Sequence, residues 1–107
     1  MYYVNEDDWK LFCTKLPIWQ EKYIKECLLT YSLILEKDTD AANRFYELKD
    51  KINKDARHPG VMIDRKSRSN MVDIIYSLIS YHVINMDDLD EFSNALIEHI
   101  NRMIIIK

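Results

Sequence analysis

The stretch RHPGVMIDRKSRSN, residues 57–70, interrupts a chain whose other segments are patterned as helix. It contains the only glycine, Gly60, directly after Pro59, which is one of only two prolines. Glycine supplies the left-handed backbone that ends many helices, and proline cannot extend a helix, so the chain is expected to break here. One longer polar loop is therefore predicted at about residues 57–69.

The segment before this loop has the pattern of two or three helices. Asn5 is a candidate N-cap, and the acids that follow it complement the positive end of a helix dipole. A first helix is expected to end at about Leu16 and a second to cover about residues 17–37, with a bend at Pro17 or with the two merged. Residues 38–40 can cap a further helix. Its apolar stripe consists of Ala41, Phe45, Leu48 and Ile52.

The segment after the loop has the pattern of two more helices. Ser67 or Ser69 is expected to cap the first of them, which ends at about Val83. Asn85 is expected to cap the second, which keeps a helical period of apolar residues as far as Met103. The prediction is an all-α protein, a single compact bundle of four to five helices that forms one helical domain over residues 1–107.

Composition limits the classes of function. The chain has 107 residues, 48% hydrophobic and 31% charged, which is typical of one globular domain. Its formal net charge of −3 gives no general attraction for nucleic acid, so any such binding must be local. The sequence shows neither an apolar run of about 20 residues nor a secretory leader pattern, and a cytoplasmic location without membrane contact is expected.

The reactive side chains form no recognised catalytic or metal-binding motif. Cys13 and Cys27 make no CxxC pair, and His58, His82 and His99 share no ligand spacing. Reduced cysteines and structural histidines are the simpler interpretation, although a cysteine and a histidine could still meet across helices. A non-enzymatic protein without cofactor or metal is predicted.

Positive charge gathers around the predicted loop. Arginines on a loop before a helix can grip a carboxylate or a phosphate, and loops carry function more often than cores do. The residues predicted to contact a partner are Arg57, His58, Arg65, Lys66 and Arg68. The alternatives are a merely solvated loop, or a nucleic-acid-associated protein that uses the basic segment 54–68.

Two apolar segments are further candidates for contact with other chains. The first quarter is strongly aromatic, with Trp9, Phe12, Trp19 and Tyr23, and these side chains belong either to the core or to an anchor surface. The C-terminal end is apolar where tails are usually polar. It offers a homo-oligomer contact through Met103, Ile104, Ile105 and Ile106.

Short motifs in the second half of the chain carry a resemblance. They are Arg57-His58-Pro59-Gly60-Val61, Arg68-Ser69-Asn70-Met71, and Met86-Asp87-Asp88-Leu89 with Phe92-Ser93. This pattern resembles short uncharacterised all-helical proteins of low-GC Gram-positive bacteria and their mobile elements. The resemblance implies a small bacterial or phage-borne helical protein and no transferable activity. The function expected is a small protein–protein interaction module, such as a regulator or inhibitor encoded by a mobile element or phage.

Overall fold

The computed structural model describes residues 2–63 and 65–106, so Asp64 in the predicted loop lies outside the described residues, as do Met1 and Lys107. Within those ranges the chain is all-α and contains no strand. Its elements are α1 (Glu6–Leu35), α2 (Ala41–Asp55), α3 (Met71–Ser80), the short 3-10 helix η1 (Met86–Leu89) and α4 (Asn94–Ile106). The all-α prediction is confirmed, and none of the described helices is long and apolar enough to span a membrane.

Helix α1 continues through Pro17, so the merged alternative is correct and the break at Leu16 is wrong. Proline removes one backbone hydrogen bond from a helix interior. Here the Pro17 side chain is exposed, whereas Leu16 and Trp19 on either side of it are buried in the core. Packing on both sides of the proline therefore holds the helix together across the missing bond.

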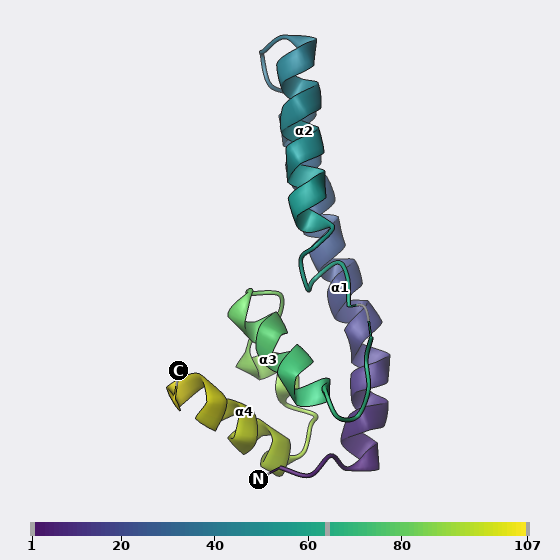
Figure 1. Ribbon diagram of the computed structural model, residues 1–107, viewed down its shortest axis with the longest axis vertical. Coiled ribbons are helices and arrows are strands. Elements are labelled where there is room, and N and C mark those ends of the chain that lie inside the picture. The colour runs from purple at the N-terminus through teal and green to yellow at the C-terminus, as the bar shows by residue number, and fades with distance from the viewer. Residues whose placement is uncertain (1, 64, 107) are drawn as a thin grey trace.

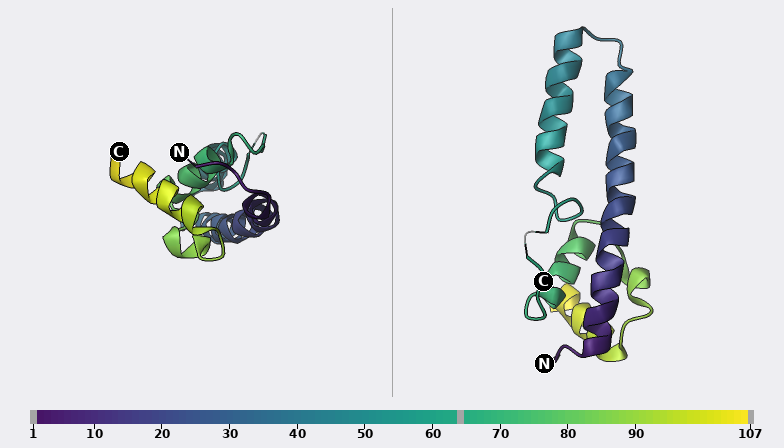
Figure 2. Two further views of the ribbon diagram at one scale, coloured as in Figure 1. Left: turned by 90° about the horizontal axis from the view of Figure 1, so that it is seen from below. Right: turned by 90° about the vertical axis from the view of Figure 1, so that its right-hand side faces the viewer.

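The molecule is elongated, and the expectation of a single compact bundle is wrong. Its radius of gyration is 16.8 Å and its extents are 54 × 27 × 21 Å, whereas a compact chain of this length would have a radius of about 13 Å. Helices α3 and α4 lie beside the N-terminal half of α1, and α2 turns back along its C-terminal half (Figures 1 and 2). We call the projecting pair, residues 21–55, the arm.

The hydrophobic core lies at the other end of the molecule, around the first four turns of α1. Three elements that are distant in the sequence converge there: α1, α3 and the segment from η1 to α4. The most deeply buried side chains are Phe12, Met71, Ile75, Leu78, Leu89, Leu96 and Ile100. Each such side chain stabilises the fold by roughly 1.5–3 kcal/mol, so the stability of the protein resides mainly in this end.

The C-terminal segment corrects the prediction of a helix that begins at Asn85. Asn85 does act as a cap, because its Oδ1 accepts from the Asp87 amide at 2.9 Å while its own amide donates to Asp88. The turn that it starts is η1, which ends at Leu89, and α4 begins only after Ser93. The interruption allows both Leu89 and Phe92 to be buried in the core.

The start of α3 also differs from the prediction. Neither Ser67 nor Ser69 caps it: their hydroxyls bond to each other at 3.0 Å, and α3 begins at Met71. Asn70 organises the approach instead, since its Oδ1 accepts from the Ser67 amide at 2.8 Å. At the other end α3 stops at Ser80, short of the expected end, and His82 adopts left-handed backbone with φ 61°.

The left-handed backbone expected at Gly60 is absent, because its φ is not positive. The position needs a glycine because no side chain fits there. A Cβ atom there would lie 2.5 Å from Tyr23 Cδ2 and 2.9 Å from Val83 Cγ2. The Tyr23 ring cannot easily yield, because it is stacked on His58 at 4.6 Å. Gly60 therefore lets the loop pass close to α1.

We expect Gly60→Ala to lower the free energy of unfolding by about 1.5 kcal/mol through overpacking. The measurement is urea unfolding followed by circular dichroism. Met62→Ala, at an exposed position in the same loop, is the control and should change little. A Gly60→Ala protein as stable as the wild type would show that the Tyr23 ring is free to move.

Candidate interaction surface

The predicted partner-binding residues do not form one patch, and Arg68 is already engaged within the chain. Its Nε and a terminal nitrogen donate to the Glu6 carboxylate at 2.7 and 3.0 Å, and its guanidinium lies 5.2 Å from the centre of the Trp9 ring. The hydrogen bond from Arg68 lowers the pKa of Glu6. Arg68 thus holds the loop against the first turns of α1.

His58 is likewise engaged with its own chain. Its ring stacks on Tyr23 at 4.6 Å, meets the Tyr81 ring edge-on at 5.1 Å, and accepts a hydrogen bond from the Gly60 amide at 3.0 Å through Nδ1. Burial lowers the pKa of His58, opposed by the charge of Asp55. This neutral imidazole joins the base of the arm to the end of α3.

The lowered pKa of His58 predicts a pH dependence of stability. Because the unfolded chain takes up a proton that the folded chain resists, the free energy of unfolding should fall as the pH drops below the ordinary histidine value of about 6.5. Urea unfolding at about pH 7 and about pH 5 measures the difference, and His58→Gln should reduce it. An equal pH dependence in His58→Gln would assign the effect to other groups.

The three remaining cations of the predicted site are exposed and separate. Arg57, Arg65 and Lys66 form no ion pair with any residue in the described part of the chain. Arg57 lies beside Lys54 at the end of α2, whereas Arg65 and Lys66 lie in the loop. The basic segment therefore provides scattered positive charge.

The aromatic N-terminal residues contribute largely to the core. Phe12 and Trp19 are buried, and Trp9 and Tyr23 are half-buried. At the C-terminal end, Met103 packs partly against the core. The three isoleucines that follow it are exposed to 36% at Ile104, 78% at Ile105 and 83% at Ile106.

A buried polar junction fixes the two helices of the arm to each other. Asp55 is only 5% exposed, and its carboxylate accepts from the Tyr31 hydroxyl at 2.6 Å and from Lys51 Nζ at 2.8 Å. Burial alone would raise the pKa of Asp55, but the hydrogen bonds from Lys51 and Tyr31 outweigh burial and lower it. Burial and the hydrogen bond to Asp55 raise the pKa of Tyr31.

One side of the arm is apolar and uncovered. On α1, Leu28 and Leu35 are 56% and 54% exposed; on α2, Phe45 and Ile52 are 61% and 42% exposed. Their spacing places each pair on one side of its helix. Ile52 lines the same cavity as Ile24, so the two sides form a common surface. We call this surface the apolar arm face: Ile24, Leu28, Leu35, Phe45, Leu48 and Ile52.

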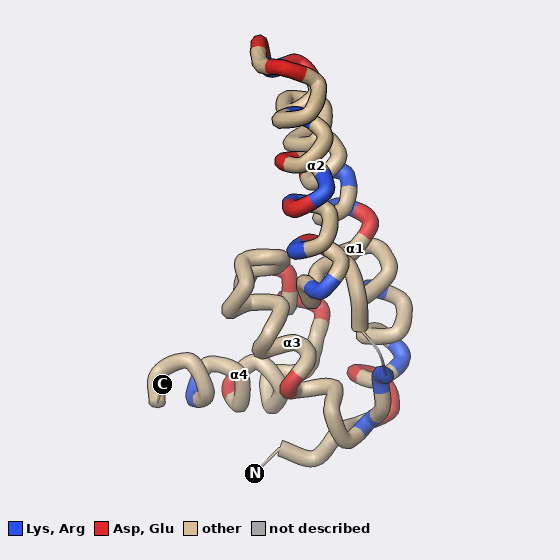
Figure 3. Tube along the Cα trace, turned by 45° about the horizontal axis from the view of Figure 1, so that its top comes forward, with Lys and Arg blue, Asp and Glu red and all other residues tan. Residues whose placement is uncertain are grey.

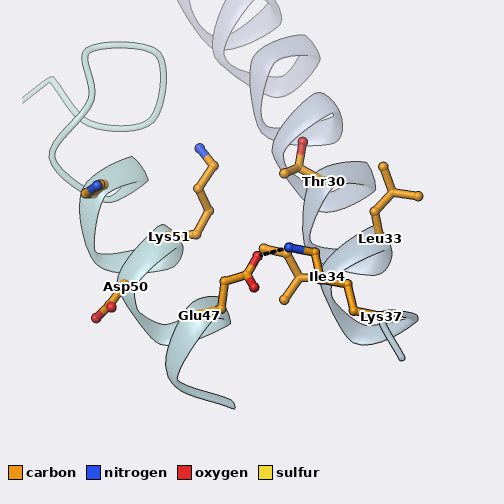
Figure 4. Close-up of a pocket in the computed structure, with 8 residues that line it drawn as sticks. Thr30, Leu33, Ile34, Lys37, Glu47, Asp50 and Lys51 are labelled. Atoms are coloured by element: carbon orange, nitrogen blue, oxygen red, sulfur yellow. Dashed lines mark hydrogen bonds and ion pairs between the residues drawn. The ribbon is translucent and has the colours of Figure 1, made fainter. Parts of the chain in front are cut away.

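The opposite side of the arm is a groove of mixed charge. An ion pair between Lys37 and Glu47 crosses it, and Leu33 is the exposed apolar residue among the side chains that line it (Figure 4). The lining residues are Thr30, Leu33, Ile34, Lys37, Glu47, Asp50, Lys51 and Lys54. The two sides of the arm thus differ sharply in polarity.

Charge also changes along the arm. The turn at its tip carries three acids, Glu36, Asp38 and Asp40, with Lys37 among them. The C-terminal end of α2, at the base of the arm, carries Lys51 and Lys54, and Arg57 follows it. Figure 3 shows acidic residues at the tip and both basic and acidic residues lower on α2.

The periodicity of the sequence predicts this face only in part. The spacing of Leu28 and Leu35, and of Phe45 and Ile52, identifies two apolar stripes, and in a compact bundle both would be buried. In the structure only Cys27 and Ile34 are fully buried apolar residues of the arm. The missing signal is the chain's overall arrangement, in which α3 and α4 lie beside the N-terminal half of α1 and away from the arm.

Comparison with known proteins suggests no function, so the functional argument starts from the apolar arm face. No family model, curated protein or solved structure matches the chain. Among residues 2–63 and 65–106, no three histidine, cysteine, aspartate or glutamate side chains are grouped so that they could hold a metal ion. The function proposed below therefore rests on the geometry of the arm.

Proposed function

We propose that this protein is a non-enzymatic protein–protein interaction module whose contact surface is the apolar arm face. The observation that carries the proposal is the exposure of Leu28, Leu35, Phe45 and Ile52 side by side on a projecting hairpin. Contiguous exposed apolar surface of this kind marks interaction sites on soluble proteins. A regulator or inhibitor of this type acts by occupying another protein surface.

The energetics of the arm support the same proposal. Helices of about 12–15 residues are marginal in water without packing partners, and α2 has only 15 residues. The main packing partner of α2 is α1, and the arm's fully buried apolar residues are Cys27 and Ile34. A bound partner would supply the packing that the arm lacks.

Of the basic residues predicted from the sequence, Arg57 and His58 lie at the base of the arm, nearest to this proposed contact. Interfaces typically have an apolar centre and a polar rim in which arginine is enriched. Arg57 at the base of the arm is exposed and can meet an acidic group on the partner, whereas Arg65 and Lys66 lie in the loop that Arg68 holds against the first turn of α1, away from the arm. His58 and Arg68 serve the contact indirectly, because they hold the loop in place.

The proposal is tested by photo-cross-linking in cells that express the protein. A photoreactive side chain at Leu28 should yield an adduct of defined mass, because Leu28 lies on the apolar arm face. The same group at Leu29, which is 69% exposed and lies about 100° further around α1, is the matched control and should yield much less. Absence of a specific adduct at Leu28 contradicts the proposed function.

The geometry gives less support to the alternative of nucleic-acid association through residues 54–68. Arg68 is neutralised by Glu6, and Asp50 and Asp55 lie among the cations of α2. A nucleic-acid partner would show a steep loss of affinity with salt, because phosphate contacts release counterions. Binding through the apolar arm face should depend much less steeply on salt.

A further inference from the structure

We infer that the turn of residues 58–62 is a proton-sensitive cover at the base of the arm: when His58 takes up a proton at Nδ1, the turn moves away from α1 and exposes Cys27 and Ile24. The inference deepens the proposed function and rests on it for its consequence, because Ile24 belongs to the apolar arm face. The opening itself is a property of the chain alone and is measured without a partner.

The turn is closed by hydrogen bonds to His58. The amides of Val61 and Met62 both donate to the His58 carbonyl at 2.9 Å, and the Gly60 amide donates to His58 Nδ1 at 3.0 Å. A neutral ring with its proton on Nε2 can accept this last bond, whereas an imidazolium carries a proton on both nitrogens and accepts none. Protonation therefore sets two N–H groups against each other inside the turn.

The same ring attaches the turn to two other segments. It stacks on Tyr23 of α1 with the ring planes 7° apart, and it meets the ring of Tyr81, directly after α3, at 78°. A further bond to α1, from Gln20 Nε2 to the Pro59 carbonyl, is long at 3.4 Å and therefore weak. A disturbance at His58 thus acts where the turn, α1 and the end of α3 meet.

Val61 is the residue by which the turn covers the arm. It lines a small cavity together with Ile24, Cys27 and Ile52. Cys27 is only 6% exposed, and Ile24 is half-buried. When the turn moves away, the cavity loses the wall that Val61 supplies, and the Cys27 thiol and the base end of the apolar arm face meet solvent.

The surroundings of His58 set the direction of the pH response. Helix α2 presents Asp55 and Lys51 to the ring, while α1 and the segment after α3 present the phenols of Tyr23 and Tyr81. Burial lowers the pKa of His58, Asp55 opposes this change and Lys51 adds to it. In the open turn the ring regains the ordinary histidine value of about 6.5. The open turn therefore binds the proton more tightly, and opening increases as the pH falls below that value.

Two of the groups that face the ring keep their charge over this pH range. Burial would raise the pKa of Asp55, but the hydrogen bonds from Lys51 and Tyr31 lower it below 3.8. Burial raises the pKa of Tyr23 to about 12. Neither group contributes to a change between about pH 7 and about pH 5.

The reactivity of the Cys27 thiol tests the inference. With Cys13 replaced by Ser, the rate of reaction with dithiodipyridine is divided by the rate for the urea-unfolded chain at the same pH, and the ratio measures how often Cys27 is exposed. We expect this ratio to rise several-fold from about pH 7 to about pH 5, and by at most about 30-fold, since one proton bound at about 6.5 contributes no more than a factor of ten per pH unit.

Two histidine variants assign the effect. His58→Phe keeps an aromatic ring beside Tyr23 but cannot take up a proton, so its ratio should be equal at the two pH values. His82→Asn removes an exposed histidine near the same end of α3 and should keep the wild-type rise. Hydrogen exchange gives a second readout: the amides of Gly60 and Val61 should lose protection in acid while those of α3 stay protected.

The outcomes separate this inference from the proposed function. An equal ratio at both pH values in the wild type, or a rise that persists in His58→Phe, overturns the cover; His58→Gln repeats the test if circular dichroism shows that His58→Phe is not folded. Parallel loss of protection in α3 and α4 also overturns it, because the whole chain then unfolds. A failed Leu28 cross-link contradicts the proposed function and leaves the thiol result unchanged.

Discussion

Replacement of Asp8 by alanine should lower the free energy of unfolding by about 3 kcal/mol, the scale expected when a buried, hydrogen-bonded carboxylate is removed and its donors lose their partner. Asp8 is only 3% exposed. The loss should appear as a lower urea midpoint without a change in the slope of the transition.

The contacts of Asp8 explain the size of this effect. Its carboxylate accepts from the Tyr2 hydroxyl at 2.6 Å, from Asn5 Nδ2 at 3.1 Å, and from both the amide and the hydroxyl of Ser93 at 2.9 and 2.6 Å. The Ser93 hydroxyl also accepts from the Leu96 amide at 3.2 Å in the first turn of α4. Asp8 therefore joins the two ends of the chain, and its loss should weaken the docking of α4.

Asp7→Ala is the matched control for this prediction. Asp7 is exposed in the same first turn of α1 and has the same interaction with the helix dipole, which contributes at most about 1 kcal/mol. If Asp7→Ala and Asp8→Ala destabilise the protein equally, the dipole and not the junction with Ser93 is the source of the effect.

Local hydrogen bonding explains which parts of the fold the sequence could predict. The sequence predicts caps at Asn5, within residues 38–40 and at Asn85, and the side chains of Asn5, Asp40 and Asn85 each accept from an amide two or three residues ahead. Such bonds depend on near neighbours only. For Asp8 the sequence predicts only the interaction with the helix dipole, because nothing in the sequence indicates a partner 85 residues away.

Packing between distant segments explains what the sequence could not predict. The continuation of α1 through Pro17 depends on the burial of Leu16 and Trp19, and the break before α4 depends on the burial of Phe92. The arm arises because α3 and α4 cover only the N-terminal half of α1. Periodicity identified the stripe that contains Leu28 and Leu35, but it could not show that this stripe is uncovered.

Replacement of Asp55 by alanine should loosen the arm by about 2–3 kcal/mol, because the Tyr31 hydroxyl and the Lys51 ammonium both lose a buried acceptor. The lowered pKa of Asp55 means that its contribution is present at neutral pH and is lost in acid, as the pH falls below the ordinary value of 3.8 and through the lower value of the folded state.

Hydrogen exchange in α2 measures this change directly, because local opening of the arm need not unfold the core. Protection of the α2 amides should fall in Asp55→Ala and remain in Asp50→Ala, an exposed acid in the same helix. Tyr31→Phe should produce a smaller loss, of about 1 kcal/mol, as expected for one hydrogen bond. Unchanged protection in Asp55→Ala would mean that apolar contacts alone hold the arm together. A loosened arm should also weaken association through the apolar arm face, because ordering α2 would then add to the cost of binding.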